Sequence, residues 1–336
     1  MATRSLLILG VLLLFFETVA ENLKAPPIEG LSLGRGVNLG NALEAPFEGA
    51  WGVILREEYF DLIAQVGFNT VRIPIRWSGH AAKFPPYTIS KQFFARVDWA
   101  IENALRRGLN VIINVHHYDE LYRDPERERE RFLALWQQIA DRYSVYPENL
   151  IFELLNEPHA ALTPEVWNEL LREALRVVRK TNPERWVIIG PGNWNHVRAL
   201  PTLNLPPEDK KIIVTFHYYE PFPFTHQGAE WVQGSAAWLG TRWTGSPSEK
   251  QAIVEDLDFA VRWAVAEGRP LFLGEFGAYR RADMASRVQW TAFVAREAEK
   301  RGIPWAYWEF CAGFGIYDPA TRKWREDLLR ALIPQN

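Results

Sequence analysis

The sequence has one cysteine, Cys311, among its 336 residues. A single cysteine excludes an intrachain disulfide framework and any cysteine-based zinc or iron–sulfur cluster, so we interpret Cys311 as a small buried hydrophobe. Long runs of one charge are also missing, because 38 Lys and Arg are matched by 41 Asp and Glu, for a net charge of -3. Without a basic stretch that could follow a phosphate backbone, we expect no nucleic-acid partner.

Long apolar runs are confined to the N-terminus. An arginine precedes the run Leu6–Phe16, and Thr18–Ala20 offers small residues of the kind that signal peptidase reads. The run is too short to span a bilayer, which needs about 20 apolar residues. The sequence therefore predicts a signal peptide over residues 1–20 and a secreted domain over 21–336, with no membrane partner after cleavage. An uncleaved anchor is the alternative, which Glu17 disfavours because it interrupts the run.

Aromatic residues, in contrast, are plentiful, with 15 Trp, 11 Tyr and 19 Phe. Apolar runs of strand length recur along the chain, and most are separated by segments with apolar residues at three- and four-residue spacing, such as 94–105 and 167–178. Alternating strand and helix periods predict an α/β protein with a single-domain (β/α)8 TIM barrel. The eight predicted strands are Gly36–Leu39, Thr70–Ile75, Asn110–His116, Leu150–Asn156, Trp186–Gly190, Ile212–Tyr218, Leu271–Glu275 and Trp305–Trp308.

Turn residues support this reading. Four glycines lie shortly before predicted strands, where a left-handed helix cap is expected, and Ser246–Glu249 has the pattern of a helix start with a capping box. A doubly wound open sheet is the alternative fold. The segment Gly34–Gly40 lacks the G-x-G-x-x-G spacing that such a sheet commonly uses to bind a dinucleotide, which disfavours the open sheet.

Polar residues close nearly every predicted strand, and in a barrel of this type the active site lies at the C-terminal ends of the strands. One such residue alone could be a satisfied polar group of the core, but their recurrence at equivalent positions indicates a functional site. The strand-end residues are Asn38, Arg72, Arg76, His116, His117, Tyr118, Asn156, Glu157, His217, Tyr218, Tyr219, Glu275, Trp308 and Glu309.

Two of these residues are carboxylates, Glu157 and Glu275, on strands expected to face each other across the barrel. Carboxyls that share a water-poor site cannot both ionise at their usual pKa, so one can donate a proton while the other stays charged. Glycoside cleavage needs this division of labour. Arg72 and Tyr219 are suited to keep Glu275 ionised.

The other acidic residues near the strand ends are expected to have different roles. Glu153 is expected to form an internal ion pair with an arginine. By strand alternation Glu309 should face away from Trp308. Asp119 and Glu120 are expected to be solvated.

Together these motifs resemble glycoside hydrolase family 5, a family of retaining (β/α)8 glycosidases in clan A. Within it the chain is similar to bacterial endoglucanases that also accept mannans. The resemblance covers residues from about 38 to 308. It is carried by Gly36–Asn41 (GVNLGN), Val71–Ile75 (VRIPI), Asn114–Tyr118 (NVHHY), Leu155–Pro158 (LNEP), Thr215–Tyr219 (TFHYY), Gly274–Gly277 (GEFG) and Tyr307–Trp308.

The resemblance implies an endo-β-1,4-glycanase that acts by double displacement, with Glu157 as acid/base and Glu275 as nucleophile. Asn156 would bind the hydroxyl beside the anomeric carbon, and Trp308 would lie under the sugar at the cleavage point. The remaining residues would orient the two carboxylates or line neighbouring subsites: Arg72, His116, His217 and Tyr219, and then His117, His226, Trp231 and Asn38. The implied partner is a β-1,4-linked polysaccharide, glucan with mannan as a further candidate. We expect no metal or other cofactor, and a monomer.

Two rival functions remain open. A metal-dependent barrel hydrolase could assemble His116, His117, His217 and His226 with a carboxylate, although adjacent histidines on a strand should point to opposite faces. A non-catalytic carbohydrate-binding barrel would keep the aromatic residues and lose the chemistry. For Trp51, Trp194, Trp238 and Trp243 the sequence favours core or loop packing.

Overall fold

The computed structural model describes residues 23–334. The predicted signal peptide lies outside these residues. Within the described part, none of the helices combines the length and the apolar character that crossing a membrane requires.

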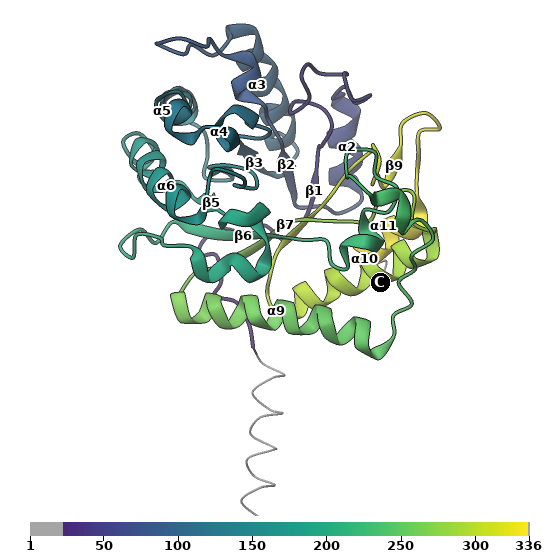
Figure 1. Cartoon of the computed structure of the whole chain (residues 1–336). Helices are drawn as coiled ribbons and strands as arrows, with labels where there is room; N and C mark the ends of the chain where they lie inside the picture. The colour runs from purple at the N-terminus through teal and green to yellow at the C-terminus, as the bar shows by residue number, and fades with distance from the viewer. Residues whose placement is uncertain (1–22, 335–336) are drawn as a thin grey trace, which may run out of the picture.

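Eight parallel strands close into a barrel in chain order, which confirms the predicted (β/α)8 fold (Figure 1). Each strand overlaps its predicted run, and most of the observed strands end earlier than the sequence suggested. Their bounds are β1 Arg35–Asn38, β2 Thr70–Ile73, β3 Asn110–Asn114, β4 Leu150–Glu153, β5 Val187–Ile189, β6 Ile212–Tyr218, β7 Leu271–Phe276 and β8 Trp305–Tyr307.

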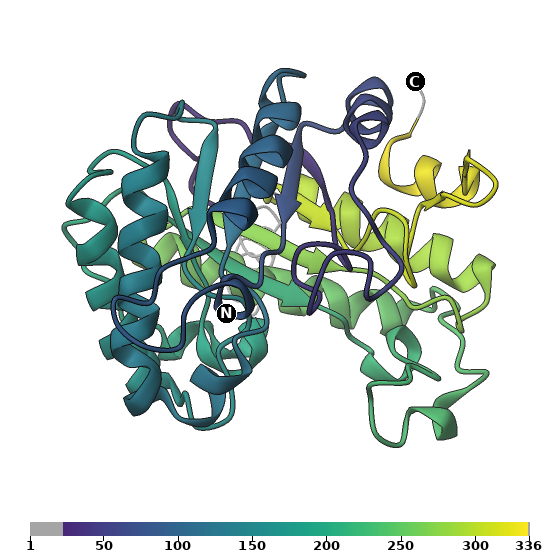
Figure 2. The ribbon, with the colours of Figure 1, turned by 90° about the horizontal axis from the view of Figure 1, so that it is seen from above.

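Helices surround the barrel, and the C-terminal segment folds back beside α10, near the C-terminus in Figure 2. The α-helices are α2 Glu57–Gln65, α3 Lys91–Leu105, α4 Asp119–Arg123, α5 Pro125–Tyr143, α6 Pro164–Arg179, α7 Gly192–Asn195, α8 Phe222–Thr225, α9 Pro247–Glu267, α10 Met284–Lys300 and α11 Glu326–Leu332. The 3-10 helices are η1 Trp77–His80, η2 Val197–Thr202 and η3 Ser235–Trp238, and a small hairpin joins β9 Tyr317–Asp318 to β10 Lys323–Trp324.

Local sequence signals set several helix ends. The Ser246 hydroxyl accepts a hydrogen bond from the backbone N–H of Glu249, and the Glu249 carboxylate accepts one from the backbone N–H of Ser246, so α9 begins with the predicted capping box. The helix ends at Gly268, which has a φ of 61°. Glycine adopts this left-handed conformation without a Cβ clash, which lets the chain turn directly into β7.

The barrel interior is built in two layers. Inward side chains near the strand N-termini form an apolar layer that includes Ile112, Ile151, Ile213 and Phe272, and Leu31 of the N-terminal segment packs against it. Two residues further along the strands the inward positions become polar. Because every second strand residue points inward, an apolar layer near the strand N-termini is followed by a polar layer, and the polar layer faces the C-terminal ends of the strands. Its members include Asn38, Arg72, Asn114, Glu153 and Thr215.

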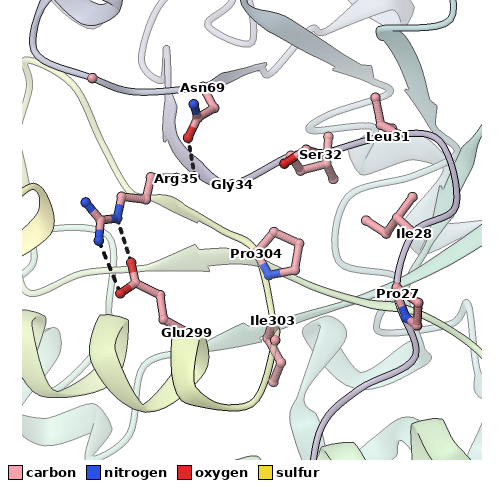
Figure 3. A pocket seen from close by; sticks show the side chains of 13 residues that line it. Pro27, Ile28, Leu31, Ser32, Gly34, Arg35, Asn69, Glu299, Ile303 and Pro304 are labelled. Carbon is pink, nitrogen blue, oxygen red and sulfur yellow. Dashed lines mark hydrogen bonds and ion pairs between the residues drawn. The ribbon is translucent and has the colours of Figure 1, made fainter.

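A cavity of about 500 Å³ lies at the opposite end of the barrel (Figure 3). Its lining includes Arg35, the first residue of β1, and Pro304, which directly precedes β8. Arg35 Nε donates to Glu299 Oε1 at 2.7 Å at one side of the cavity. Since catalytic groups of such barrels lie at the strand C-termini, this cavity is separate from the candidate site.

Candidate active site

Arg72 lies at the centre of the polar layer and is completely buried. Nε and Nη2 donate to the two oxygens of Glu153 at 2.6 and 2.7 Å, which confirms the predicted internal ion pair. Nη1 donates to Asn38 at 2.8 Å and to Glu275 at 2.7 Å, and Nη2 also donates to Asn156 at 2.8 Å. All five N–H groups of the guanidinium are thus used. Burial acts to lower the pKa of Arg72, but Glu153 and Glu275 outweigh it and raise the pKa.

Glu275 is held from two sides. Its Oε1 accepts from Arg72, and its Oε2 accepts from the Tyr219 hydroxyl at 2.9 Å. Burial raises the pKa of Glu275 above its ordinary value, while His217 and Arg72 act to lower it. The arrangement fixes this carboxylate in one orientation beside a permanent positive charge.

Glu157 has a different environment. It follows β4 in the left-handed conformation, with a φ of 45°, and its side chain retains 26% exposure. Oε1 lies 2.7 Å from Nδ1 of His217. Burial raises the pKa of Glu157 to about 7, against the lowering effects of Arg72 and His159. Near neutral pH this carboxyl can therefore carry a proton and remain accessible from outside.

His217 connects the two carboxyls. A register shift between Phe216 and His217 in β6 sets His217 opposite Glu275 of β7. Its Nδ1, bonded to Glu157, is also 3.6 Å from Glu275 Oε2. Burial lowers the pKa of His217 to about 4, so the ring is neutral at neutral pH and has a single N–H.

His116 and His117 lie side by side, with ring centroids 4.6 Å apart. The expectation that they point to opposite faces was wrong, because β3 ends at Asn114 and His117 has a φ of 49°. Strand alternation no longer applies beyond the end of the strand. Burial lowers the pKa of His117 to about 4 and that of His116 well below its ordinary range.

Trp308 stacks on His116, with centroids 5.9 Å apart and planes 9° from parallel. Its ring also approaches Gly40, where a Cβ would come within 3.0 Å of the indole. Asn156 is almost fully buried, and because its Oδ1 accepts from Arg72, its amide N–H₂ group remains available. Asn38 is fully buried with its side chain bonded to Arg72 and Gly274, so it supports Arg72 from inside the barrel.

The segment 220–245 contains α8 and η3, and it contributes His226 and Trp231. His226 stacks on Phe222 at 4.1 Å and meets the Tyr219 ring at 4.9 Å. Burial lowers the pKa of His226 to about 4. Trp231 is 60% exposed and contacts Tyr279 edge-on. These aromatic side chains extend outward from Tyr219 and hence from Glu275.

The remaining acids lie apart from the pair. Glu309 turns into its own loop, where its oxygens accept backbone N–H groups of Cys311, Ala312 and Phe314 at 2.7–3.0 Å. Asp119 is 53% exposed and pairs with Arg76. Cys311 is buried, as predicted.

Two of the tryptophans for which the sequence favours core or loop packing are exposed at the candidate site. Trp194 is 53% exposed and stacks on His159 at 4.8 Å, and Nδ1 of that histidine is bonded to the backbone oxygen of Glu157 at 2.6 Å. Trp51 is 42% exposed and meets His117 edge-on at 5.4 Å. Both therefore border the candidate site, whereas Trp243 is buried as expected.

Sequence reasoning also missed Tyr122 and Asn195. The Tyr122 hydroxyl donates to the backbone oxygen of Asn156 at 2.6 Å, and the Asn195 amide lies against His217. Tyr122 is in a short helix with no motif around it. For Asn195 the only signal was its position shortly after a predicted strand.

A metal could be considered where side-chain ligands converge. One ligand atom each of Glu157, His217 and Glu275 lie within 4.8 Å of one another, and no second group of His, Cys, Asp or Glu is found within residues 23–334. The four-histidine set of the metal-dependent alternative is thus not assembled in the described chain. The same three groups are what acid–base chemistry between two carboxyls requires.

Comparison with known proteins places this geometry in context. The family model described as Cellulase (glycosyl hydrolase family 5) matches residues 35–313. Endoglucanase H of Acetivibrio thermocellus is 39% identical over 90% of this chain, which spans 33% of that relative's length. Endoglucanase A of Ruminococcus albus is 30% identical, and the match covers 90% of each chain.

Solved structures agree with the sequence comparisons. The crystal structure of Thermotoga maritima Cel5A in complex with mannotriose superposes with a TM-score of 0.89 and is 58% identical, covering 90% of this chain and 97% of that one. A structure of the same protein in complex with cellobiose gives the same TM-score and identity.

Proposed function

The chain belongs to glycoside hydrolase family 5, and from this premise we propose that it cleaves internal β-1,4 bonds of glucan by double displacement. The observation that carries the proposal is the contrast between two neighbouring carboxyls. Glu275 is pinned by Arg72 and Tyr219, whereas Glu157 has a raised pKa, partial exposure and a neutral histidine partner.

In the first step Glu275 attacks the anomeric carbon while Glu157 gives its proton to the departing oxygen. A glycosyl ester of Glu275 results, and Glu157 is left ionised. In the second step Glu157 takes a proton from water, and the resulting hydroxide displaces Glu275. Oxygens of the two carboxyls lie within 4.8 Å of each other, which leaves no room for a water beside the sugar and supports retention of configuration.

The groups around the pair fit a pyranose ring. Trp308 offers an indole face, which packs on sugar C–H groups, and the free N–H₂ group of Asn156 can donate to the hydroxyl beside the anomeric carbon. Trp194 and His159 border Glu157, the carboxyl that protonates the leaving group, so we assign them to the leaving-group side of the bond.

Product stereochemistry after chemical rescue tests the assignments. Glu275→Ala should lose turnover and regain it with azide as an α-azide, because azide then replaces the nucleophile and inverts the centre. Glu157→Ala should be rescued as the β-azide, because azide then attacks an intact glycosyl ester. The opposite pair of products would reverse the two roles.

Mannan is a second candidate substrate. It is favoured by the Thermotoga maritima structure, which was determined with mannotriose at 58% identity to this chain. Initial rates on barley β-glucan, carboxymethylcellulose, glucomannan and galactomannan test it, and activity on the two glucans alone would exclude it. We further propose secretion as a monomer after cleavage near Ala20. N-terminal sequencing of the exported protein and light scattering test these two points.

A further inference from the structure

Asn195 ends the short helix α7 in an unusual backbone conformation. Asn193, Trp194 and Asn195 have φ values of 58°, 57° and 54°, so three consecutive non-glycine residues are left-handed. L-residues rarely adopt this conformation, and it persists only where the surrounding structure holds it. The amide N–H of Trp194 donates to the Pro158 backbone oxygen at 3.1 Å, which ties the turn to the residue after Glu157.

The turn directs the Asn195 side chain inward, where it is fully buried. Its Nδ2 lies 3.4 Å from Nε2 of His217. A Cβ at Gly190 would lie 2.2 Å from Asn195 Oδ1, so the space for this amide exists because residue 190 is glycine. The Asn195 amide therefore contacts His217 through Nδ2, while its Oδ1 has no hydrogen-bond partner in the described chain.

His217 cannot easily turn away from this contact. Nδ1 is bonded to Glu157, and a Cβ at Gly274 would come within 3.1 Å of Nε2. The neutral ring has one proton for two nitrogens, and the neighbour of each nitrogen decides where that proton resides. The other charged or titratable groups acting on the ring are Glu275, Arg72, Glu153 and His116.

We propose that Asn195 is a positioning residue that fixes the tautomer of His217 and thereby determines which oxygen of Glu157 carries the acid proton. The amide donates to Nε2, so the ring proton resides on Nδ1 and is donated to Glu157 Oε1. The acid proton is then left on Oε2, which is free to face the departing oxygen. This inference rests on the proposed function, since the proton concerned is the one transferred in glycoside cleavage.

Asn195→Asp is the sharpest variant, because it keeps the shape and the left-handed tolerance while replacing the donor by an acceptor. The ring proton should move to Nε2, and Nδ1 should then accept a hydrogen bond from the acid proton, which is held on Glu157 Oε1 and turned away from the departing oxygen. We expect kcat to fall by about tenfold or more, because a correctly positioned general acid contributes about 10²–10⁴-fold to the rate, with little change in KM. Losing the Nδ1–H donor should also move the basic limb of the kcat/KM profile to higher pH.

Asn193→Asp is the matched control, because it introduces the same charge two residues away in the same turn, on an exposed side chain. Asn195→Gly removes the amide and keeps the backbone relaxed, so it serves if the aspartate variant folds poorly. Thr215→Val removes the Thr215 hydroxyl, which also has no hydrogen-bond partner within residues 23–334 and which lies, like His217 Nε2, close to Gly274. Two-bond 1H–15N correlation spectra, with the His217 signal identified from His217→Gln, report the tautomer without requiring activity.

The expected result is an Nδ1–H tautomer in the wild type and in the Asn193→Asp and Thr215→Val variants, and an Nε2–H tautomer with a shifted basic limb in Asn195→Asp. An unchanged tautomer in both Asn195 variants overturns the inference, and so does a change caused by Thr215→Val alone. If the wild type hydrolyses no glycoside, the proposed function fails, and the spectra still decide the role of Asn195.

Discussion

Replacing Arg72 by lysine tests how much the buried hydrogen-bond network of Arg72 contributes to stability and to the ionisation of Glu275. Arg72 serves four side chains through five hydrogen bonds and is completely buried. Lysine has three donors on one nitrogen and lacks the planar fork, so at least two of the five bonds are lost. A buried polar group left without a partner costs about 1–3 kcal/mol. The Arg72→Lys variant should therefore lose about 2–6 kcal/mol of unfolding free energy.

The same change should alter the pH dependence of catalysis. Arg72 is one of the groups that lower the pKa of Glu275, in part through the 2.7 Å hydrogen bond to its Oε1. Loss of that bond raises the pKa of Glu275. Because the nucleophile must be ionised, the acidic limb of the kcat/KM profile should move to higher pH.

Arg76→Lys is the matched control. Arg76 makes a surface pair with Asp119, which is 53% exposed, and such pairs contribute about 0–1 kcal/mol. Guanidinium unfolding and kcat/KM profiles on an aryl β-cellobioside would be measured for both variants. If the unfolding free energy of Arg72→Lys is within about 1 kcal/mol of that of the control, and its acidic limb does not move, Arg72 neither stabilises the fold nor lowers the pKa of Glu275 as proposed.

Three further predictions follow from single contacts. Glu157 must be protonated to act as the acid, and its pKa is raised to about 7, so kcat/KM should fall as the pH rises through about 7; a profile that stays flat to pH 9 would contradict this role. Trp194→Ala should raise KM for long oligosaccharides by about fivefold, for a loss of about 1 kcal/mol of stacking, with no change in melting temperature because the ring is exposed. Glu309→Gln should lower the unfolding free energy by about 1–3 kcal/mol, measured by chemical denaturation. Both carboxylate oxygens of Glu309 accept backbone N–H groups of the loop, and an amide has only one accepting oxygen. Glu326→Gln, at an exposed position, should have no effect in the same measurement.

The barrel could be predicted because its signals are local and repeated. Each strand is an apolar run bounded by turn residues, and capping signals such as Ser246–Glu249 behave the same way in any helix. The internal ion pair of Glu153 with an arginine also followed from the sequence, because Glu153 lies on a strand, where alternation determines which side chains face inward; the structure identifies the arginine as Arg72. Periodicity was reliable wherever the backbone was regular.

Prediction became unreliable where the strands end. The opposite orientation expected for His116 and His117 failed because His117 is left-handed after β3. The exposure of Trp194 could not be foreseen for the same reason, since its direction is determined by three left-handed residues after β5. Asn tolerates the left-handed conformation but does not dictate it, and for His117 and Trp194 the conformation depends on contacts between distant parts of the chain.

These irregular positions are concentrated at the candidate site. Within residues 23–334, nine non-glycine residues have positive φ. Besides Tyr87 and Arg322, all of them follow β1, β3, β4 or β5: Asn41, His117, Glu157, Ala160, Asn193, Trp194 and Asn195. A left-handed residue costs about 1–2 kcal/mol, so Glu157, His117 and Asn195 together oppose folding by about 3–6 kcal/mol. That cost is of the same order as the loss of about 2–6 kcal/mol expected for Arg72→Lys. Arg72 bonds the side chain of Asn156, the residue before Glu157, so changes that weaken Arg72 should disturb the orientation of Glu157.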